Sequence, residues 1–150
     1  MSNRLSLLLA SFFYIGKFPL APGTLASVAG MFLSIWLGGN TAVYILVFLL
    51  ITLTGFAVSG RIEDITQEKD PSCVVIDEVA GVLFTMIAIP ITIHFLIYGF
   101  VLFRVLDVVK PPPAKYFDTR LKNGWGIVMD DVVSGIYANI ILHLIVATQI

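Results

Sequence analysis

Long apolar runs separated by short polar stretches dominate the sequence. The runs cover residues 24–37, 41–59, 79–89, 95–103 and 127–147. Crossing a hydrocarbon core of ~30 Å takes ~20 helical residues, a length that only 41–59 and 127–147 approach. The other runs are short, and breaks fall at Gly38-Gly39-Asn40 and from Pro90 to His94. The pattern predicts an all-α, polytopic membrane helical bundle with two helical hairpins and five spans. One kinked helix over 79–103, which would leave four spans, is the alternative.

The composition favours a membrane protein with a single domain over residues 1–150. Hydrophobic residues make up 58% of the chain, charged residues only 13%, and the mean hydropathy is +0.96. Soluble domains carry about 25% charged residues, so the apolar excess is expected to face lipid. The N-terminus, Arg4 followed by an apolar stretch to Tyr14, is similar to a signal peptide. Lys17 follows it without a small-residue cleavage site, so we expect a retained helix at the membrane interface.

The charged residues indicate the orientation in the membrane. In the five-span arrangement all nine lysine and arginine residues and all ten aspartate and glutamate residues fall on one side. Lysine and arginine in short loops stay in the cytoplasm, so this charged face is predicted to be cytoplasmic. His94 and His143 lie toward the other side and are interpreted as ordinary interfacial side chains. The net charge of -1 and the lack of a basic tract give no indication of nucleic-acid binding.

Two carboxylate pairs stand beside apolar runs, Asp77-Glu78 and Asp130-Asp131. Ionisable residues at membrane helices are costly, and by default they mark function. Acidic residues also cap helices by meeting the positive end of the helix dipole, which is the structural alternative for both pairs. We predict that these two pairs meet, together with the helix end that carries Arg104 and Asp107, and build a metal-assisted phosphate site. Their charges would repel unless a cation binds. Ligands made only of oxygen favour a hard cation such as Mg²⁺, and Asp107 is a further candidate ligand.

Basic and hydroxyl side chains on the same side could bind phosphate. Arg104 and Asp107 share one helix face, and Lys110 precedes three prolines that end the helix. A fixed guanidinium suits bidentate recognition of phosphate. Thr24 is predicted to cap the next helix after Pro22-Gly23, and free amide groups at such an end bind anions. Lys17 and Ser27 are the remaining candidates in this group.

Several phosphatase chemistries lack their motifs. Cys73 has no arginine at the sixth position after it, and neither an Asp-x-Asp-x-Thr motif nor a Walker loop occurs. What remains is attack on phosphorus by a water on the metal or by a carboxylate, with positioning and electrostatics supplying most of the rate. The other class considered is a small proton- or cation-coupled transporter. Transport sites lie near the bilayer midplane, usually between repeats, whereas these acids cluster at one rim.

Four segments together carry a family resemblance: APGTLAS (21–27), DPSCVVIDEVAG (70–81), FRVLDVVKP (103–111) and GIVMDDVVSGIYA (126–138). In this order they resemble phosphatidylglycerophosphatase A over nearly the whole chain. Ala26 and Asn123 stand where the family pattern has glycine. The resemblance implies Mg²⁺-dependent removal of the terminal phosphate of phosphatidylglycerophosphate, giving phosphatidylglycerol in the bacterial inner membrane. Its substrate and surroundings would be phospholipids, with Asp77, Glu78, Asp130 and Asp131 as the catalytic groups.

Overall fold

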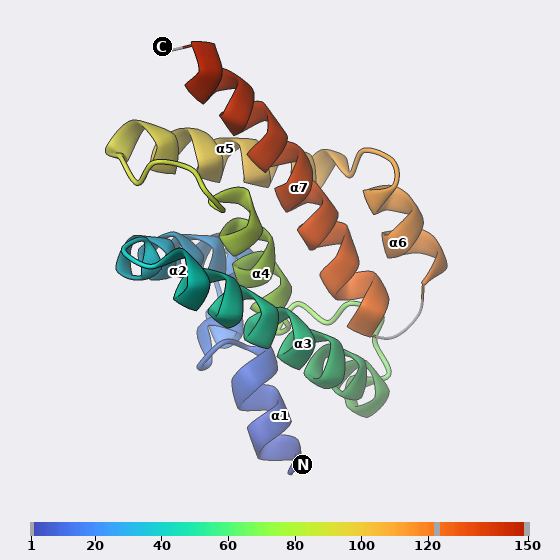
Figure 1. Cartoon of the computed structure of the whole chain (residues 1–150). Helices are drawn as coiled ribbons and strands as arrows, with labels where there is room; N and C mark the ends of the chain where they lie inside the picture. The colour runs from blue at the N-terminus through green and yellow to red at the C-terminus, as the bar shows by residue number, and fades with distance from the viewer. Residues whose placement is uncertain (1, 122–123, 149–150) are drawn as a thin grey trace.

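The fold is helical throughout the part of the chain that the computed structural model describes, residues 2–121 and 124–148. The predicted all-α class is confirmed. Figure 1 shows α4 in the middle of the molecule, and it packs against α2, α3, α5 and α7. The elements are α1 (Asn3–Ala10), a 3-10 turn at Ile15–Lys17, α2 (Pro22–Leu37), α3 (Thr41–Thr66), α4 (Ile76–Thr85), α5 (Ile93–Val109), α6 (Ala114–Arg120) and α7 (Gly124–Thr148).

Both predicted breaks are present. Asn40 caps α3, because its side-chain oxygen accepts hydrogen bonds from the amides of Ala42 and Val43 at 3.1 and 3.2 Å. The alternative of one kinked helix over 79–103 is wrong, since α4 ends at Thr85 and α5 begins only at Ile93.

The end of α4 is stabilised by a partner from α7. Ala88 adopts a left-handed conformation (φ 57°) that an α-helix cannot contain. The carbonyls of Thr85 and Ile87, released at this end, accept hydrogen bonds from the Asn139 side chain at 3.0 and 2.9 Å. The break between α4 and α5 is therefore built into the packing.

The start of α2 differs from the prediction. Thr24 was expected to cap the helix, but α2 begins at Pro22, with Ala21 at the cap position in a left-handed conformation. Proline is favoured at the first helical position because the backbone N–H there has no partner within the helix, so its absence in proline removes no hydrogen bond. Thr24 consequently lies inside the first turn. Helix α6 follows the three prolines and has no counterpart in the predicted elements.

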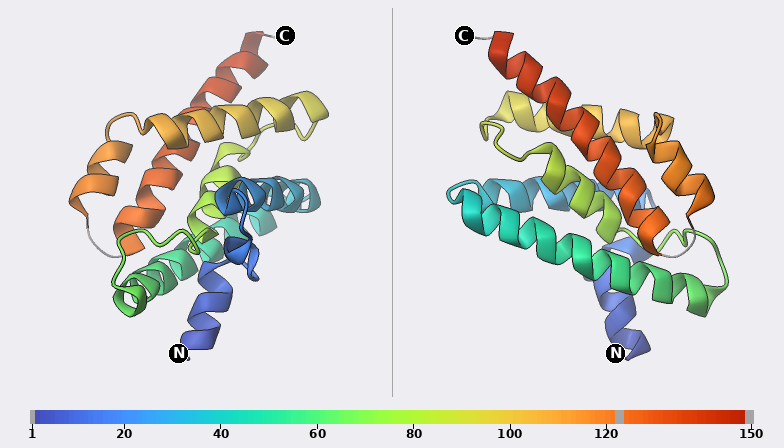
Figure 2. Two further views of the ribbon diagram at one scale, coloured as in Figure 1. Left: turned by 180° about the vertical axis from the view of Figure 1, so that it is seen from behind. Right: turned by 45° about the vertical axis from the view of Figure 1, so that its right-hand side comes forward.

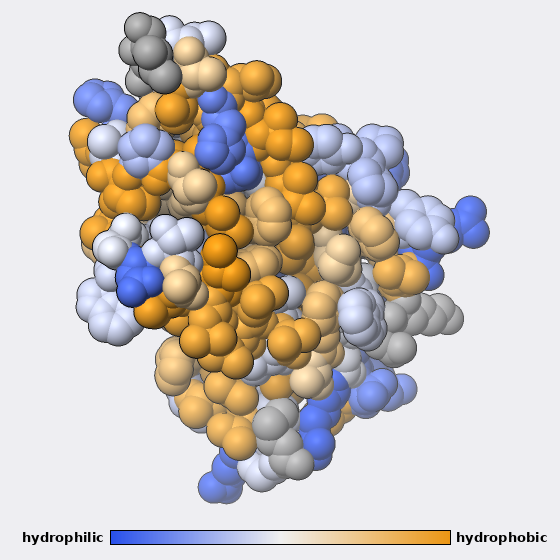
Figure 3. All heavy atoms as spheres, in the orientation of Figure 1, coloured by the Kyte–Doolittle hydropathy of each residue, from blue (hydrophilic) through white to orange (hydrophobic). Residues whose placement is uncertain are grey.

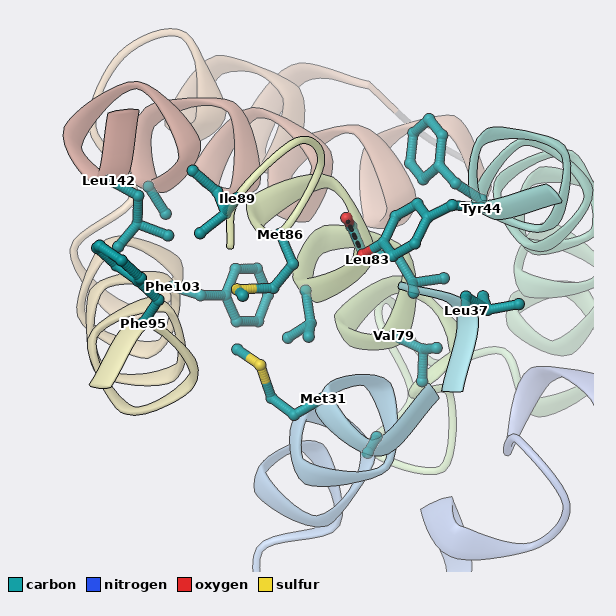
Figure 4. Close-up of a cluster of buried hydrophobic side chains, with 14 of the residues drawn as sticks. Met31, Leu37, Tyr44, Val79, Leu83, Met86, Ile89, Phe95, Phe103 and Leu142 are labelled. Atoms are coloured by element: carbon teal, nitrogen blue, oxygen red, sulfur yellow. Dashed lines mark hydrogen bonds between the residues drawn. The ribbon is translucent and has the colours of Figure 1, made fainter. Parts of the chain in front are cut away.

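The core surrounds α4. Val79, Ala80, Val82 and Leu83 are fully buried. In Figure 4, Met31 of α2 points toward Met86 and Phe103, so α2, α5 and the end of α4 share one apolar cluster. The Tyr44 hydroxyl donates a hydrogen bond to the Leu83 carbonyl at 2.8 Å and so ties α3 to α4.

Among the residues that the structure describes, two helices are long and apolar enough to cross a membrane, α3 and α7. Large apolar side chains of α3 are exposed, for example Leu46 (56%) and Leu53 (62%), as expected of a surface that faces lipid. Figure 3 shows hydrophobic side chains gathered across the middle of the molecule, with hydrophilic ones toward α1 and over α6. Lys122 and Asn123, which enter the charge count and the family pattern, lie outside the described residues.

Candidate active site

Helices α4 and α7 approach each other closely through two glycines. A Cβ atom on Gly135 would overlap the carbonyl oxygen of Gly81, and one on Gly81 would lie 2.7 Å from the carbonyl oxygen of Asp131. Each glycine follows an aspartate by four residues, about one helical turn. Asp77 and Asp131 therefore lie at the same level of the packed pair, on the faces where the two helices meet.

An acidic cluster results. Oxygens of Asp77, Glu78 and Asp131 all lie within 4.8 Å of one another. Asp77 and Asp131 are 6% and 4% exposed. The Oδ1 atom of Asp77 and the Oε2 atom of Glu78 are buried without a hydrogen-bond partner. Buried carboxylate oxygens normally find a partner, so these two atoms fit a cation that the carboxylates would hold in common.

The electrostatics of this cluster also favour a bound cation. Asp77 and Glu78 lie in the first turn of α4, a helix of ten residues that is too short to span a bilayer. Burial raises the pKa of Asp77 well above its usual range, and the charge of Glu78 adds to the effect. Burial also raises the pKa of Glu78, to about 7. Without a cation the protein disfavours having all these carboxylates ionised together.

Two cationic side chains face the cluster, each held by an aspartate. Arg104 donates from its guanidinium to Asp107 Oδ2 at 2.6 Å, one turn along α5. Lys110, the residue that ends α5, donates to Asp130 Oδ2. Arg104 stays about a quarter exposed and Lys110 similarly so. Both can therefore reach a ligand that enters the site.

The N-terminal end of α2 forms the remaining wall. A Cβ atom on Gly23 would overlap Glu78 Oε1 and would lie 3.6 Å from a guanidinium nitrogen of Arg104. Glycine at this position lets the α2 backbone approach both groups.

The resulting cavity has a volume of about 370 Å³. Fourteen residues line it: Ala21, Pro22, Gly23, Thr24, Asp70, Ser72, Val74, Asp77, Glu78, Arg104, Asp107, Lys110, Asp130 and Asp131. They come from α2, the loop between α3 and α4, α4, α5 with Lys110 at its end, and α7. Carboxylates and cations from segments far apart in the sequence thus face one space.

Eight of the ten site candidates line this cavity: Thr24, Asp77, Glu78, Arg104, Asp107, Lys110, Asp130 and Asp131. The structure does not bring Lys17 and Ser27 to it. The Lys17 ammonium lies over the Tyr14 ring, 5.1 Å from its centroid. The buried Ser27 hydroxyl donates to the Gly23 carbonyl at 2.8 Å.

Helix capping does not account for Asp130 and Asp131. They lie more than one turn inside α7, which begins at Gly124 and has no acidic residue in its first turn. The loop residues Asp70 and Ser72 were not candidates from the pattern alone. Their signal is their place in the segment 70–81, which runs directly into Asp77.

The fold and the cavity define a class of protein. Over residues 2–121 and 124–148 it is all-helical, with two candidate membrane spans and a buried carboxylate cluster suited to a divalent cation. Beside this cluster, arginine and lysine suit an anionic group such as phosphate. The chain belongs to the phosphatidylglycerophosphatase A family, whose model matches residues 8–146.

Curated relatives agree with the family. The chain is 38% identical to phosphatidylglycerophosphatase A of Haemophilus influenzae, over 92% of this chain and 86% of that protein. It is 34% identical to phosphatidylglycerophosphatase A of Escherichia coli, over 92% of this chain and 81% of that protein. A Bacteroides thetaiotaomicron protein named "Putative phosphatidylinositol-3-phosphatase" is 33% identical, over 92% and 91%. No solved structure matches the chain. By family, the protein is a phosphatase.

Proposed function

We propose that this protein hydrolyses the terminal phosphate monoester of phosphatidylglycerophosphate, giving phosphatidylglycerol and inorganic phosphate. The names of the Haemophilus and Escherichia relatives support this lipid. The observation that carries the chemistry is the meeting of Asp77, Glu78 and Asp131 in one cavity with two cationic side chains. Bare carboxylates would repel a phosphate, so the proposal includes a divalent cation.

Mg²⁺ is the proposed cation. Asp77, Glu78 and Asp131 would hold it, with Asp107 and Asp130 as further candidate ligands lining the same cavity. The donors are carboxylate oxygens, the ligands that hard cations prefer, and two of them are buried without another partner. When bound, Mg²⁺ would offset the repulsion among the carboxylates and the negative charge on the transferred phosphoryl group.

Arg104 and Lys110 would bind the phosphate oxygens. The Arg104 fork can contact two oxygens at once, and its ion pair with Asp107 holds the guanidinium beside the cavity. Lys110 supplies a point charge whose position is set by Asp130. Held between these cations and the acidic cluster, the phosphorus atom is presented to a nucleophile in a fixed orientation.

The carboxylates would also handle the proton. Either one of them accepts the proton of an attacking water, or a carboxylate oxygen attacks phosphorus itself and water then hydrolyses the acyl phosphate. In both routes the phosphorus–oxygen bond to the glycerol breaks, and the departing alkoxide takes up a proton.

We place the site at the cytoplasmic face of a bacterial inner membrane that the chain crosses several times. The two long apolar helices and their exposed leucines support membrane insertion. The orientation rests on the location of the lysines and arginines beside the site, such as Arg104 and Lys110.

A phosphate-release assay tests the proposal. Purified protein in mixed micelles is given phosphatidylglycerophosphate with Mg²⁺, and then with EDTA in its place. Release that requires the cation is expected, and it should exceed release from phosphatidylinositol 3-phosphate, the lipid in the name of the Bacteroides relative. Absence of cation-dependent release from phosphatidylglycerophosphate would contradict the proposal. Cation flux into proteoliposomes without hydrolysis would instead favour the transporter.

A further inference from the structure

An apolar groove runs between α2 and α5, outside the acidic cavity. Only apolar side chains line it, among them Val28, Phe32 and Ile35 of α2 and Ile93, Ile97 and Phe100 of α5, and its volume is about 300 Å³. Its rims are open to the surroundings, since Phe32 is 68% exposed and Ile93 64%. A groove of this composition has no means of binding a head group and suits a hydrocarbon chain.

The groove lies beside the cavity, because α2 and α5 contribute to both. Thr24 and Arg104 line the cavity, and Val28 and Phe100, each four residues away, line the groove. α2 and α5 run in opposite directions side by side (Figure 2). At one end Gly23 lies against Arg104, which lines the cavity. Halfway along, a Cβ atom on Gly99 would lie 3.5 Å from the Met31 side chain, and Ile35 and Ile93 line the far end.

The dimensions fit a single acyl chain. From Thr24, which lines the cavity, to Ile35 at the far end of the groove, α2 rises by about 16 Å. One leaflet contributes about half of a ~30 Å hydrocarbon core, so its acyl chains extend over a similar length. Met31 also lines the groove but is buried, and its side chain points toward Met86 and Phe103 (Figure 4).

We propose that this groove binds an acyl chain of the same phospholipid whose phosphate enters the cavity. The inference rests on the proposed function. It adds that binding of the acyl chain in the groove positions the phosphate of the same lipid in the cavity. Another apolar hollow is lined mainly by residues near α1 and on α3, such as Leu9 and Leu50, and also by Leu33 of α2 and Ile76 of α4. None of its lining residues comes from α5, the helix that carries Arg104 and ends at Lys110, so that hollow does not lead to the proposed phosphate-binding side chains.

The test fills the groove with a bulky side chain and compares two substrates. Ile97→Trp narrows the groove, and Leu53→Trp is the matched control on α3, since Leu53 is 62% exposed and Ile97 52%. Phosphate release is measured with phosphatidylglycerophosphate in mixed micelles and with its deacylated, water-soluble head group. Both reactions use the cavity, but only the first has a chain to place in the groove.

Ile97→Trp is expected to raise KM for the diacyl lipid about tenfold, the effect of removing well-placed apolar contacts, and to leave hydrolysis of the deacylated compound unchanged. Leu53→Trp should alter neither. An unchanged KM for Ile97→Trp, or an equal rise in Leu53→Trp, would overturn the proposal.

Unmodified protein gives a second test that does not depend on a variant folding. When lipids of different acyl length compete in the same micelle, kcat/KM should rise with chain length and then level off. If kcat/KM does not change with acyl-chain length, the proposed acyl-chain binding in the groove is wrong, while the proposed function still stands. Failure to release phosphate from either compound would instead contradict the proposed function itself.

Discussion

Replacing Gly81 by alanine tests whether the contact between α4 and α7 sets the active-site geometry. The new Cβ atom would overlap the Phe103 ring carbon Cε2 and would lie 2.7 Å from the Asp131 carbonyl oxygen. Ordinary van der Waals contact begins near 3.4 Å, so the Phe103 ring must shift and the α4 and α7 backbones must separate by about 0.7 Å at Asp131. The change therefore acts on the distance between Asp77 and Asp131 without removing any functional group.

Two effects on stability oppose each other in this variant. Overpacking a well-packed contact typically costs about 1–3 kcal/mol. Alanine in place of a helical glycine returns about 0.5–1 kcal/mol because the unfolded chain loses less freedom. We expect a small net destabilisation. The effect on activity should be larger, since a misplacement of ~1 Å at catalytic groups can cost about 100-fold in rate.

The assay measures kcat/KM for phosphate release alongside the thermal unfolding midpoint. Gly39→Ala is the control, because a Cβ atom there meets nothing within 4 Å. Gly81→Ala should lose activity by about two orders of magnitude while remaining folded, and Gly39→Ala should match the unmodified protein. Full activity in Gly81→Ala would refute the idea that this helix contact positions the carboxylates.

Three further substitutions test individual side chains. Asp131→Asn should abolish turnover with near-normal expression and membrane insertion, because it removes a charge from the proposed cation site; retention of most activity would show that Asp131 is not a ligand. Arg104→Lys should raise KM for the lipid about tenfold, since an ammonium cannot form the bidentate contact; an unchanged KM would remove Arg104 from the phosphate site. Lys17→Ala should keep kcat/KM within about twofold of the unmodified protein, because Lys17 lies over Tyr14 rather than in the cavity. A large decrease in kcat/KM would show that Lys17 reaches the substrate.

The sequence was sufficient for the helix breaks and for most of the cavity. Asn40 and Pro90 are local signals, and they act through the residues next to them. The spacing of Arg104 and Asp107 predicts a shared helix face, which the 2.6 Å ion pair confirms.

Features that depend on unusual backbone conformations, or on packing between distant segments, could not be predicted from local sequence signals. The start of α2 at Pro22 instead of Thr24 depends on Ala21 adopting a left-handed conformation, which its residue type does not favour. The place of Lys17 depends on the turn at Tyr14. The sequence predicted that Asp77 and Asp131 meet, but not how. Their meeting depends on Gly81 and Gly135 facing each other, a register set by packing between helices far apart in the chain.

Locating a bound divalent cation tests the central claim most directly. Mn²⁺, which accepts similar oxygen ligands, can be introduced for a crystal structure and located by its anomalous scattering. A single peak in contact with carboxylate oxygens of Asp77, Glu78 and Asp131, lost in Asp131→Asn, is the predicted result. An ion bound away from these carboxylates, or none at saturating Mn²⁺, would contradict the account.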